Sequence, residues 1–323
     1  MNAAESVVEG LPGAVAQAAD RIAGHVRVTP AMALETDAFD LSARLTLKLE
    51  QLQHAGSFKP RGAFNRILSA DSKATAAGVV AASGGNHGAA VAFAAGRLGL
   101  RADVFVPATA PQIKIDRLRA YGANVHVGGA DYAEAYAASQ TLAARTGGLV
   151  VHAYDQPETV AGQGTLAREL EAQLQGLDTV VVAVGGGGLI AGIAGWLGQR
   201  VRVVGVEPVL APTLTRALAA GTPVDVKVGG IAADSLGARR IGEIAFCAAR
   251  RGLIERTVLV EDEQIRAAQL ALWDSLRVVT EPAGAAALAA LTSGAYRPEP
   301  GERVALVVCG ANTDPASLGR AGT

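Results

Sequence analysis

Residues 179–197 read TVVVAVGGGGLIAGIAGWL, and this stretch decides the fold class of the chain. Its first part, 179–184, is an uninterrupted apolar run typical of a buried parallel strand, and 189–197 has the composition of a helix. The glycines at 185–188 join the two. A strand, a glycine loop and a helix start present backbone N–H groups and a positive dipole end, which suit a phosphate. The stretch therefore predicts an α/β fold with a phosphate-binding loop.

The same alternation extends along the chain in both directions. Runs rich in β-branched residues alternate with alanine-rich segments of helical length, the pattern of mostly parallel sheets flanked by helices. We expect strands at 45–49, 79–83, 103–106, 124–127, 149–152, 179–184, 202–206, 257–260 and 304–308, and helices at 87–98, 132–145, 159–174, 189–197 and 263–276. So many strands predict two lobes: a small domain of residues 79–148, and a large domain formed by residues 1–78 and 149–323. A ligand site is then expected in the cleft between them.

The composition indicates a protein that acts on a small molecule. The 323 residues carry a net charge of −1, so the chain lacks the basic surplus of proteins that bind nucleic acid or anionic membranes. Cys247 and Cys309 are the two cysteines, too few for a disulfide framework or a cysteine-bound zinc site. The sequence shows neither a signal-peptide pattern nor an apolar run long enough to span a membrane. We therefore expect a cytoplasmic protein.

A second stretch, SFKPRG at 57–62, contains the residue best suited to covalent chemistry. Lysine is rare in this chain: the 29 Lys and Arg residues include lysines only at 48, 59, 73, 114 and 227. An amine can lose its proton and form a Schiff base, whereas a guanidinium stays charged. Phe58 can pack on a flat ring, and Pro60 suits the first position of a helix. Lys59 is thus a candidate for covalent chemistry, and the alternative is an ordinary solvated lysine.

A third stretch, SGGNHG at 83–88, ends a predicted strand and opens a predicted helix. Either Ser83 or Asn86 can cap that helix, which is the structural explanation of these residues. A cap needs one polar side chain, however, and here Ser83, Asn86 and His87 crowd a loop made narrow by glycines. That combination suits a carboxylate at the helix N-terminus, with Asn86 directed at a polar group nearby. A structural or surface role is the alternative for His87.

The glycine loop at 185–188 has a second interpretation. Gly186, Gly188 and Ala191 match the looser form of the dinucleotide fingerprint, and Glu207 follows about where a ribose-binding acid belongs. A nicotinamide-dependent dehydrogenase is therefore a competing hypothesis, although it leaves Lys59 and the SGGNHG loop without a function. A P-loop nucleotide site is excluded because the chain has no Gly-Lys-Ser/Thr.

Together, these motifs resemble those of the fold-type II pyridoxal-phosphate enzymes, specifically the serine/threonine dehydratase and serine racemase group. The resemblance covers nearly the whole chain and argues against the dehydrogenase. It rests on SFKPRGA at 57–63, SGGNHG at 83–88, GQGT at 162–165, GGGG at 185–188, VEP at 206–208, TEPAGA at 280–285 and CGAN at 309–312. It implies a two-lobed α/β fold like that of the tryptophan synthase β-subunit, pyridoxal 5′-phosphate as cofactor, and a homodimer.

The resemblance also implies a role for each candidate residue. Lys59 would be the catalytic lysine, which carries the cofactor as an aldimine and removes the Cα proton of the substrate. The cofactor would be held by Phe58, Asn86, Gly185, Gly186, Gly187, Gly188, Leu189 and Cys309, and the substrate carboxylate by Ser83, Gly84, Asn86 and His87. Cys309 stands where many relatives have serine, facing the pyridine nitrogen. A neutral partner there makes the ring a weaker electron sink, which favours prompt β-elimination.

Departures from the group narrow the expected activity. Racemases of this group have a catalytic serine where this chain has Gly84, and glycine cannot exchange a proton. They also bind a divalent metal through an acid at the position of Thr213, so no metal site is expected, although Glu207 could help to bind a monovalent cation. The chain ends soon after Cys309, so no C-terminal regulatory domain is expected and a catabolic role is favoured.

We therefore expect β-elimination of water from L-threonine, L-serine or a related β-hydroxyamino acid, giving a 2-keto acid and ammonia. Three alternatives stay open. One is a dehydratase for 3-hydroxyaspartate or for an intermediate in the breakdown of a compatible solute of the hydroxyectoine type. The others are a β-replacement enzyme of the cysteine synthase type and a ligand-binding protein without catalysis. No residue of the sequence separates serine from threonine or from bulkier substrates.

Overall fold

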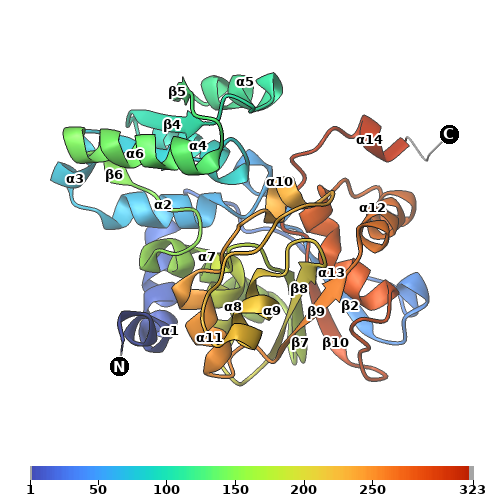
Figure 1. The fold of residues 1–323 in the computed structure, drawn as a ribbon. Coiled ribbons are helices and arrows are strands. Elements are labelled where there is room, and N and C mark those ends of the chain that lie inside the picture. The colour runs from blue at the N-terminus through green and yellow to red at the C-terminus, as the bar shows by residue number, and fades with distance from the viewer. Residues whose placement is uncertain (1, 320–323) are drawn as a thin grey trace.

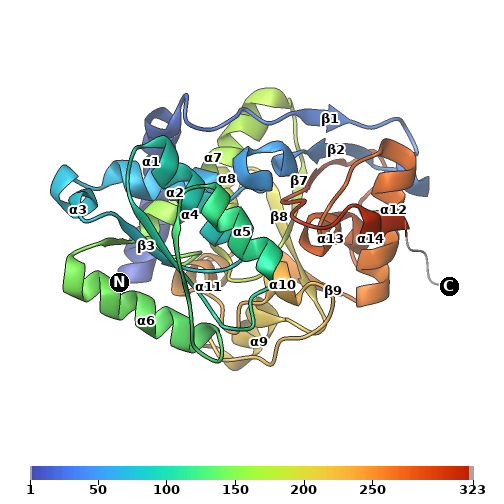
Figure 2. The ribbon, with the colours of Figure 1, turned by 90° about the horizontal axis from the view of Figure 1, so that it is seen from above.

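Two sheets, each flanked by helices, form the two lobes of the protein (Figures 1 and 2). The computed structural model describes residues 2–319. Its strands are β1 (Ala31–Ala33), β2 (Arg44–Lys48), β3 (Val79–Ala82), β4 (Ala102–Val106), β5 (Asn124–Val127), β6 (Leu149–Val150), β7 (Thr179–Ala183), β8 (Arg202–Pro208), β9 (Arg256–Val260) and β10 (Arg303–Val307). Its helices are α1 (Ala3–Ile22), α2 (Pro60–Ser69), α3 (Ser72–Ala76), α4 (Asn86–Arg97), α5 (Gln112–Ala120), α6 (Tyr132–Thr146), α7 (Pro157–Gln173), α8 (Gly188–Leu197), α9 (Thr213–Ala220), α10 (Ala233–Leu236), α11 (Glu243–Arg250), α12 (Asp262–Leu276), α13 (Pro282–Thr292) and α14 (Ala316–Gly319), with short 3-10 turns η1 (Ala38–Asp40), η2 (Glu50–Leu52) and η3 (His54–Gly56).

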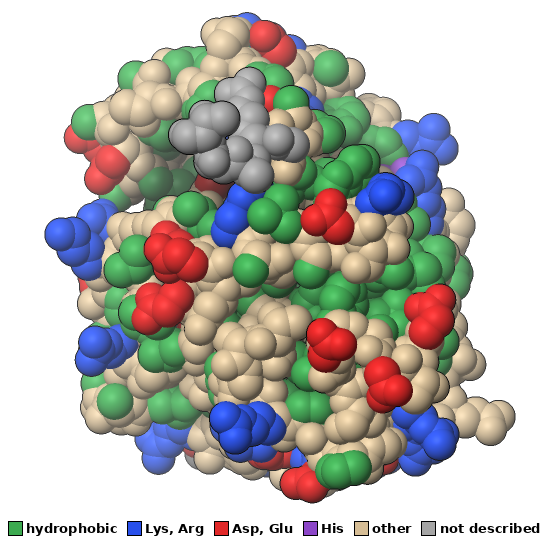
Figure 3. Space-filling model, turned by 90° about the vertical axis from the view of Figure 1, so that its right-hand side faces the viewer, with side chains coloured by type: hydrophobic (Ala, Val, Ile, Leu, Met, Phe, Trp, Pro, Cys, Tyr) green, Lys and Arg blue, Asp and Glu red, His purple; other side chains and the backbone are tan. Residues whose placement is uncertain are grey.

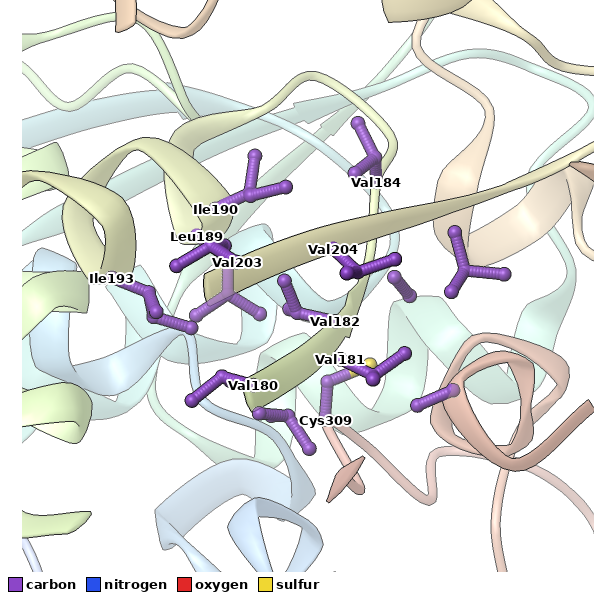
Figure 4. Packing of buried hydrophobic residues seen from close by; sticks show 14 of the residues in the cluster. Val180, Val181, Val182, Val184, Leu189, Ile190, Ile193, Val203, Val204 and Cys309 are labelled. Carbon is purple, nitrogen blue, oxygen red and sulfur yellow. The ribbon is translucent and has the colours of Figure 1, made fainter. Parts of the chain in front are cut away.

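The larger sheet has the strand order β1-β2-β10-β7-β8-β9 and belongs to the large lobe. Its neighbouring strands are parallel except β1, which pairs antiparallel with β2. In Figure 1 this sheet lies between α8 and α11 on one side and α12 and α13 on the other. Both faces are therefore covered, which explains why β7 is an uninterrupted apolar run in which Val180, Val181 and Val182 are all buried (Figure 4).

The smaller sheet has the order β5-β4-β3-β6 and is parallel throughout. Helices α4 and α6 pack on β3 and β4, and α5 packs on β5. Helix α2 contributes Ala63, Phe64 and Ile67 to the core of this lobe, although it also packs on α7 of the large lobe. Strand β6 pairs with β3 and therefore sits in the small lobe. We propose the two-domain division of the sequence with one change: the return boundary follows Val150 and not residue 148.

The predicted strands and helices are present in the predicted order, and their ends differ by a few residues. The α/β fold class is thereby confirmed. The strand expected at 149–152 is the least accurate, because β6 ends at Val150. Strand β1 and several helices, among them α1, α5, α11 and α13, were not predicted. Helix α1 begins with a capping box between Asn2 and Glu5, and its buried residues Val8, Leu11, Val15, Ala18 and Ile22 follow a helical period.

Helix α7 packs closely on two helices that carry the candidate site, and glycines make both contacts possible. Where α7 meets α2, a Cβ added to Gly162 would lie 2.7 Å from the Gly62 Cα and 2.5 Å from the Arg61 carbonyl oxygen. Where α7 meets α8, a Cβ on Gly164 would lie 2.7 Å from the Gly192 carbonyl oxygen. Side chains at these positions would force the helices apart. The GQGT motif therefore has a packing function: it fixes the helix that follows Lys59 relative to the helix that follows the glycine loop.

A buried ion network also holds the first turn of α2. Arg61, whose side chain is fully buried, donates two hydrogen bonds of 2.8 Å to Glu50 and bonds of 2.7 and 2.9 Å to Glu169. Lys48, also fully buried, donates to Glu169 at 2.9 Å and to the Thr29 carbonyl oxygen at 2.8 Å. The guanidinium thus meets each carboxylate through two N–H groups, a geometry that an ammonium cannot supply. Because Arg61 follows Lys59 by two residues, the network restrains the backbone that carries the lysine.

The described part of the chain contains no helix that is long and apolar enough to cross a membrane. Figure 3 shows the face that lies at the right of Figure 1. Acidic and basic side chains are interspersed there among apolar and neutral ones, in keeping with the net charge of −1.

The packing of α7 generates a prediction for the variant Gly162→Ala. We expect a loss of about 2 kcal/mol in the free energy of unfolding, because the added methyl group overlaps the backbone of α2. Gly10→Ala is the matched control, since residue 10 also lies inside a helix but a Cβ there meets nothing within 4 Å. That control should be neutral or more stable by up to about 1 kcal/mol. Urea unfolding followed by circular dichroism measures both, and a Gly162→Ala variant as stable as the wild type would contradict the packing account.

Candidate active site

A cavity lies between the lobes at the C-terminal ends of β7 and β10, the edge where parallel sheets bind ligands. Every residue that was predicted to hold the cofactor lines it. The full wall consists of Phe58, Lys59, Asn86, Tyr154, Ala183, Gly185, Gly186, Gly187, Gly188, Leu189, Ser235, Leu236, Glu281, Ala283 and Cys309.

A smaller cavity adjoins the first and shares Asn86 and Glu281 with it. Its other lining residues are Gly84, Gly85, Ala89, Lys114, Arg117, Leu118, Asp234 and Asn312. Four residues were predicted to bind the substrate. Gly84 and Asn86 line one or both of these cavities, whereas Ser83 and His87 line neither cavity. Lys114 and Asp234 form an ion pair between α5 and α10, so a contact between the two lobes borders this smaller cavity.

Lys59 is the last residue before α2, and Pro60 starts that helix as the sequence predicted. Its Nζ donates a 2.8 Å hydrogen bond to the Ala153 carbonyl oxygen and lies 5.0 Å from the centre of the Phe58 ring. Burial lowers the pKa of the Lys59 amine to about 8, against the opposing influence of Cys309 and Glu281. A substantial fraction of the amine is thus neutral near physiological pH, the form that can act as a nucleophile or a base.

The glycine loop is bare because neighbouring atoms occupy the space that side chains would need. A Cβ on Gly186 would lie 2.3 Å from the Tyr154 ring, and one on Gly188 would lie 2.6 Å from the Tyr154 carbonyl oxygen. Gly187 has a φ of +88°, a left-handed conformation that glycine adopts without strain. Helix α8 begins at Gly188 without a side-chain cap, so its first amides have no partner within the helix. The loop can therefore bind a phosphate through N–H groups and the helix dipole.

A chain of amide and carboxylate groups crosses from the small lobe to the large one. Asn312 Nδ2 donates to Asn86 Oδ1 at 2.6 Å, and Asn86 Nδ2 donates to Glu281 Oε1 at 2.6 Å. Burial raises the pKa of Glu281 to about 7, although the hydrogen bond from Asn86 opposes the shift. The orientation of the Asn86 side chain is thus set by Asn312 on one side and Glu281 on the other.

His87 is held by the backbone of the segment that follows β6. Its Nε2 lies 2.8 Å from the Val151 carbonyl oxygen, and the side chain is buried. Burial and the nearby Lys59 lower the pKa of His87 to about 3, so the imidazole is neutral at physiological pH and Nε2 carries the proton. These contacts support the structural alternative for His87.

Cys309 directly follows Val308, at the end of the central strand β10. The residue is 3% exposed and belongs to the same buried apolar cluster as the valines of β7 (Figure 4). Burial raises the pKa of its thiol far above the ordinary value, so the sulfur stays protonated at neutral pH. The cavity therefore has a neutral group at this end, as the sequence predicted.

Six residues of the cavity wall were not predicted: Tyr154, Ala183, Ser235, Leu236, Glu281 and Ala283. Glu281 lies in the TEPAGA motif, but an acid just before a proline that starts a helix is also an ordinary helix start. Tyr154 lies in an irregular connection, and Ser235 and Leu236 lie in the short helix α10, where no periodic pattern marks a function. These residues reach the cavity only because the fold brings distant segments together.

Comparison with known proteins places the chain in one family. The family model described as "Pyridoxal-phosphate dependent enzyme" matches residues 22–310. The chain is 38% identical to an L-threonine ammonia-lyase of Geobacter sulfurreducens, with 93% of this chain and 75% of that protein covered. It is also 38% identical to a phenylserine dehydratase of Ralstonia pickettii, with 95% and 94% covered. A biosynthetic L-threonine dehydratase of Haemophilus influenzae is 37% identical, and the chain spans 59% of its length.

Solved structures agree with this assignment. The structure of maize serine racemase superimposes with a TM-score of 0.89 at 32% identity, covering 96% of this chain and 95% of that one. A threonine deaminase from Solanum lycopersicum gives a TM-score of 0.88 at 31% identity, covering 97% and 86%. The expected fold and the expected cofactor are confirmed, and the glycine loop does not mark a dehydrogenase. The chain belongs to the pyridoxal-phosphate-dependent enzymes, in the fold-type II group of serine/threonine ammonia-lyases.

Proposed function

We propose that this enzyme removes water from L-threonine or L-serine and releases a 2-keto acid and ammonia. The observation that carries the proposal is the position of Lys59, whose amine has a lowered pKa and lies in one cavity with a bare glycine loop and a neutral thiol. The names of the relatives support the reaction class, since they are a threonine ammonia-lyase, a threonine dehydratase and a phenylserine dehydratase.

The residues of the cavity fit pyridoxal phosphate. Tyr154 occupies the space that Cβ atoms at positions 186 and 188 would need, so these positions must be glycine. The loop therefore presents only backbone atoms to an anionic group. We assign the phosphate to the loop and to Leu189, and the ring to the wall between Phe58 and Cys309. Asn86 would bind the ring hydroxyl. When bound, the cofactor withdraws electrons from the substrate Cα and makes its proton acidic.

Lys59 has two tasks at a single atom, Nζ. It holds the cofactor before the substrate arrives, and it then takes the Cα proton as the base. Both tasks need a neutral amine, and burial supplies it by lowering the pKa to about 8. The bond to the Ala153 carbonyl oxygen and the contact with Phe58 keep Nζ within the cavity.

We place the substrate carboxylate at the start of α4. Gly85 occupies the N-cap position and makes no side-chain cap bond, so the first amides of that helix are available to an anion. Gly84 and Gly85 leave the approach open, and Asn86 lies where the two cavities meet. His87 would support this loop from behind through its bond to Val151.

The protonation states of the remaining groups favour elimination. Cys309 stays a thiol, so it cannot keep a nearby ring nitrogen protonated as an aspartate would. No second base faces Lys59 at position 84, because that residue is glycine. We infer that the Cα proton leaves toward Lys59 and does not return from the opposite face.

A substrate panel separates the remaining candidates. L-threonine, L-serine, phenylserine and 3-hydroxyaspartate are compared by the amounts of keto acid and ammonia formed, with threonine or serine expected to react fastest. A product that forms from serine only when a thiol is added would indicate β-replacement. Absence of turnover with every substrate, despite bound cofactor, would indicate a binding protein.

We further propose that the enzyme works as a homodimer in the cytoplasm, as its family resemblance implies. Light scattering on the purified holoenzyme tests the assembly. A monomer at micromolar concentration would argue against it.

The first prediction concerns Lys59→Ala. We expect the yellow absorbance of the bound cofactor to disappear and turnover to fall by more than about a thousandfold, because no other group can replace the amine. Lys73→Ala is the control, since Lys73 is exposed on α3 and should keep colour and activity. Absorbance spectra and keto-acid assays measure both variants. A coloured and active Lys59→Ala enzyme would refute the assignment.

The second prediction concerns Gly84→Ser. A Cβ at this position would lie 3.5 Å from Val106 Cγ1, an ordinary contact distance, so the variant should fold. We expect it to form some D-enantiomer from L-serine, because the new hydroxyl can exchange a proton on the face opposite Lys59. The wild type and Gly84→Ala, which has similar bulk and no hydroxyl, should leave the unreacted substrate in the L form. Chiral chromatography of the recovered amino acid measures this, and racemisation by the wild type would sink the single-base account.

The third prediction concerns Glu281→Gln. The pKa of Glu281 is raised from 4.5 to about 7, so the folded protein binds this proton more tightly than the unfolded chain. Its contribution to stability is therefore present below pH about 4.5 and is lost as the pH rises to about 7. Glutamine does not titrate, so the variant should not lose stability in this way. The free energy of unfolding of the variant minus that of the wild type should therefore increase by up to about 3 kcal/mol between pH 5 and pH 8. Unfolding curves at both pH values test this, and a pH-independent difference would contradict it.

A further inference from the structure

The carboxylate of Glu207 is fully engaged by the start of helix α9. This buried residue of β8 accepts hydrogen bonds from the backbone N–H of Leu214 at 2.7 Å and of Thr215 at 2.9 Å. It also accepts from the hydroxyl of Thr215 at 2.6 Å and lies 3.2 Å from the hydroxyl of Thr213. Because both of its carboxylate oxygens are engaged, a structural role for Glu207 is favoured over that of a monovalent-cation ligand. The carboxylate acts as the acceptor for an otherwise uncapped helix.

Thr213 connects this capped helix to the glycine loop. Its Oγ donates a 2.7 Å hydrogen bond to the carbonyl oxygen of Gly185. A hydroxyl has one proton to donate, and the shorter distance assigns that proton to Gly185 rather than to Glu207 at 3.2 Å. The Thr213 side chain is fully buried, so water does not compete for this bond. The Thr213 backbone is fixed in turn because the helix it starts is anchored on Glu207.

The bond to the Gly185 carbonyl has a consequence for the amide of Gly186. In a trans peptide the C=O of one residue and the N–H of the next point in opposite directions. Because the Gly185 oxygen points at Thr213, the Gly186 N–H points away from α9. Gly185 and Gly186 both line the cavity, so an N–H that is turned away from α9 can meet a ligand of the loop.

We propose that Thr213 is a positioning residue for the cofactor phosphate: its hydroxyl holds the Gly185–Gly186 peptide so that the Gly186 amide faces the phosphate. The inference rests on the proposed function in one respect, the placement of the phosphate on the glycine loop. Glycine residues restrict their φ and ψ angles only weakly, so the Gly185–Gly186 peptide plane could take several orientations. A contact from outside the loop is needed to select one of them. Thr213 selects it through a neighbouring helix without touching the ligand.

The test compares two ligands on four enzymes. Pyridoxal phosphate and pyridoxal, which lacks the phosphate, are titrated into cofactor-free full-length protein, and the dissociation constants are read from protein fluorescence. Thr213→Val removes the hydroxyl and keeps the shape, and Thr213→Ser keeps the hydroxyl. Thr215→Val is the matched control, because it loses its bonds to Glu207 and Thr257, and none of its hydrogen bonds goes to Gly185.

We expect Thr213→Val to bind pyridoxal phosphate about five- to tenfold more weakly than wild type, with the affinity for pyridoxal unchanged. Thr213→Ser should resemble wild type, and Thr215→Val should keep the wild-type ratio of the two affinities. If Thr213→Val does not fold, Thr213→Ala replaces it with the same expectation. An unchanged ratio in the variant without the hydroxyl would overturn the inference while leaving the proposed function intact. A wild type that binds both ligands equally well would overturn the phosphate placement and the inference together.

Discussion

The close contact of helix α7 with α2 and α8 is the constraint on which the rest of the structure depends. Both contacts leave no room for a Cβ, at Gly162 against the α2 backbone and at Gly164 against the α8 backbone. Helix α2 follows Lys59 directly, and α8 starts within the glycine loop. The Lys59 amine and the glycine loop come from segments more than a hundred residues apart in the sequence, and α7 fixes the distance between them. The ion network around Arg61 adds a second restraint to the same turn of α2.

Burial is the physical cause of the chemistry available in the cavity. It lowers the pKa of Lys59 to about 8, keeps His87 neutral with a pKa of about 3, and raises the pKa values of Glu281 and Cys309. The same effect thus provides an amine with a usable neutral fraction, a neutral imidazole and a neutral thiol within one site. Hydrogen bonds restrain two groups of the site: Asn86 is bonded from two sides, and the Gly185 carbonyl accepts a bond from Thr213.

Local patterns explain why much of the fold and of the site was predictable. The glycine loop and Lys59 stand out because each motif contains its own chemistry: bare amides in one, a rare amine in the other. The sheet was predictable because buried parallel strands are continuous apolar runs. Strand β1 was missed because it is three residues long and lies at the edge of its sheet. Tyr154 was missed because the close approach of its segment to Gly186 and Gly188 exists only in three dimensions.

The buried charged residues are a part of the structure that the sequence did not indicate. Lys48, Glu50 and Arg61 are fully buried, yet in the sequence they resemble ordinary surface charges. Glu169, the partner of Lys48 and Arg61, lies more than a hundred residues away on α7, so no local pattern could pair it with them. His87 is a related case, because no local pattern indicates that its ring nitrogen lies 2.8 Å from the backbone carbonyl oxygen of Val151.

In the proposed function, Lys59 is the residue to which the cofactor is attached. Treatment of the holoenzyme with borohydride makes a lysine-bound pyridoxal group permanent, and mass spectrometry of the peptides then identifies the lysine. We expect the added mass on the peptide that contains Lys59, and on none containing Lys48, Lys73, Lys114 or Lys227. Lys114, which lines the adjoining cavity, is the most informative competitor. Modification of Lys114, or of any lysine other than Lys59, would contradict the account.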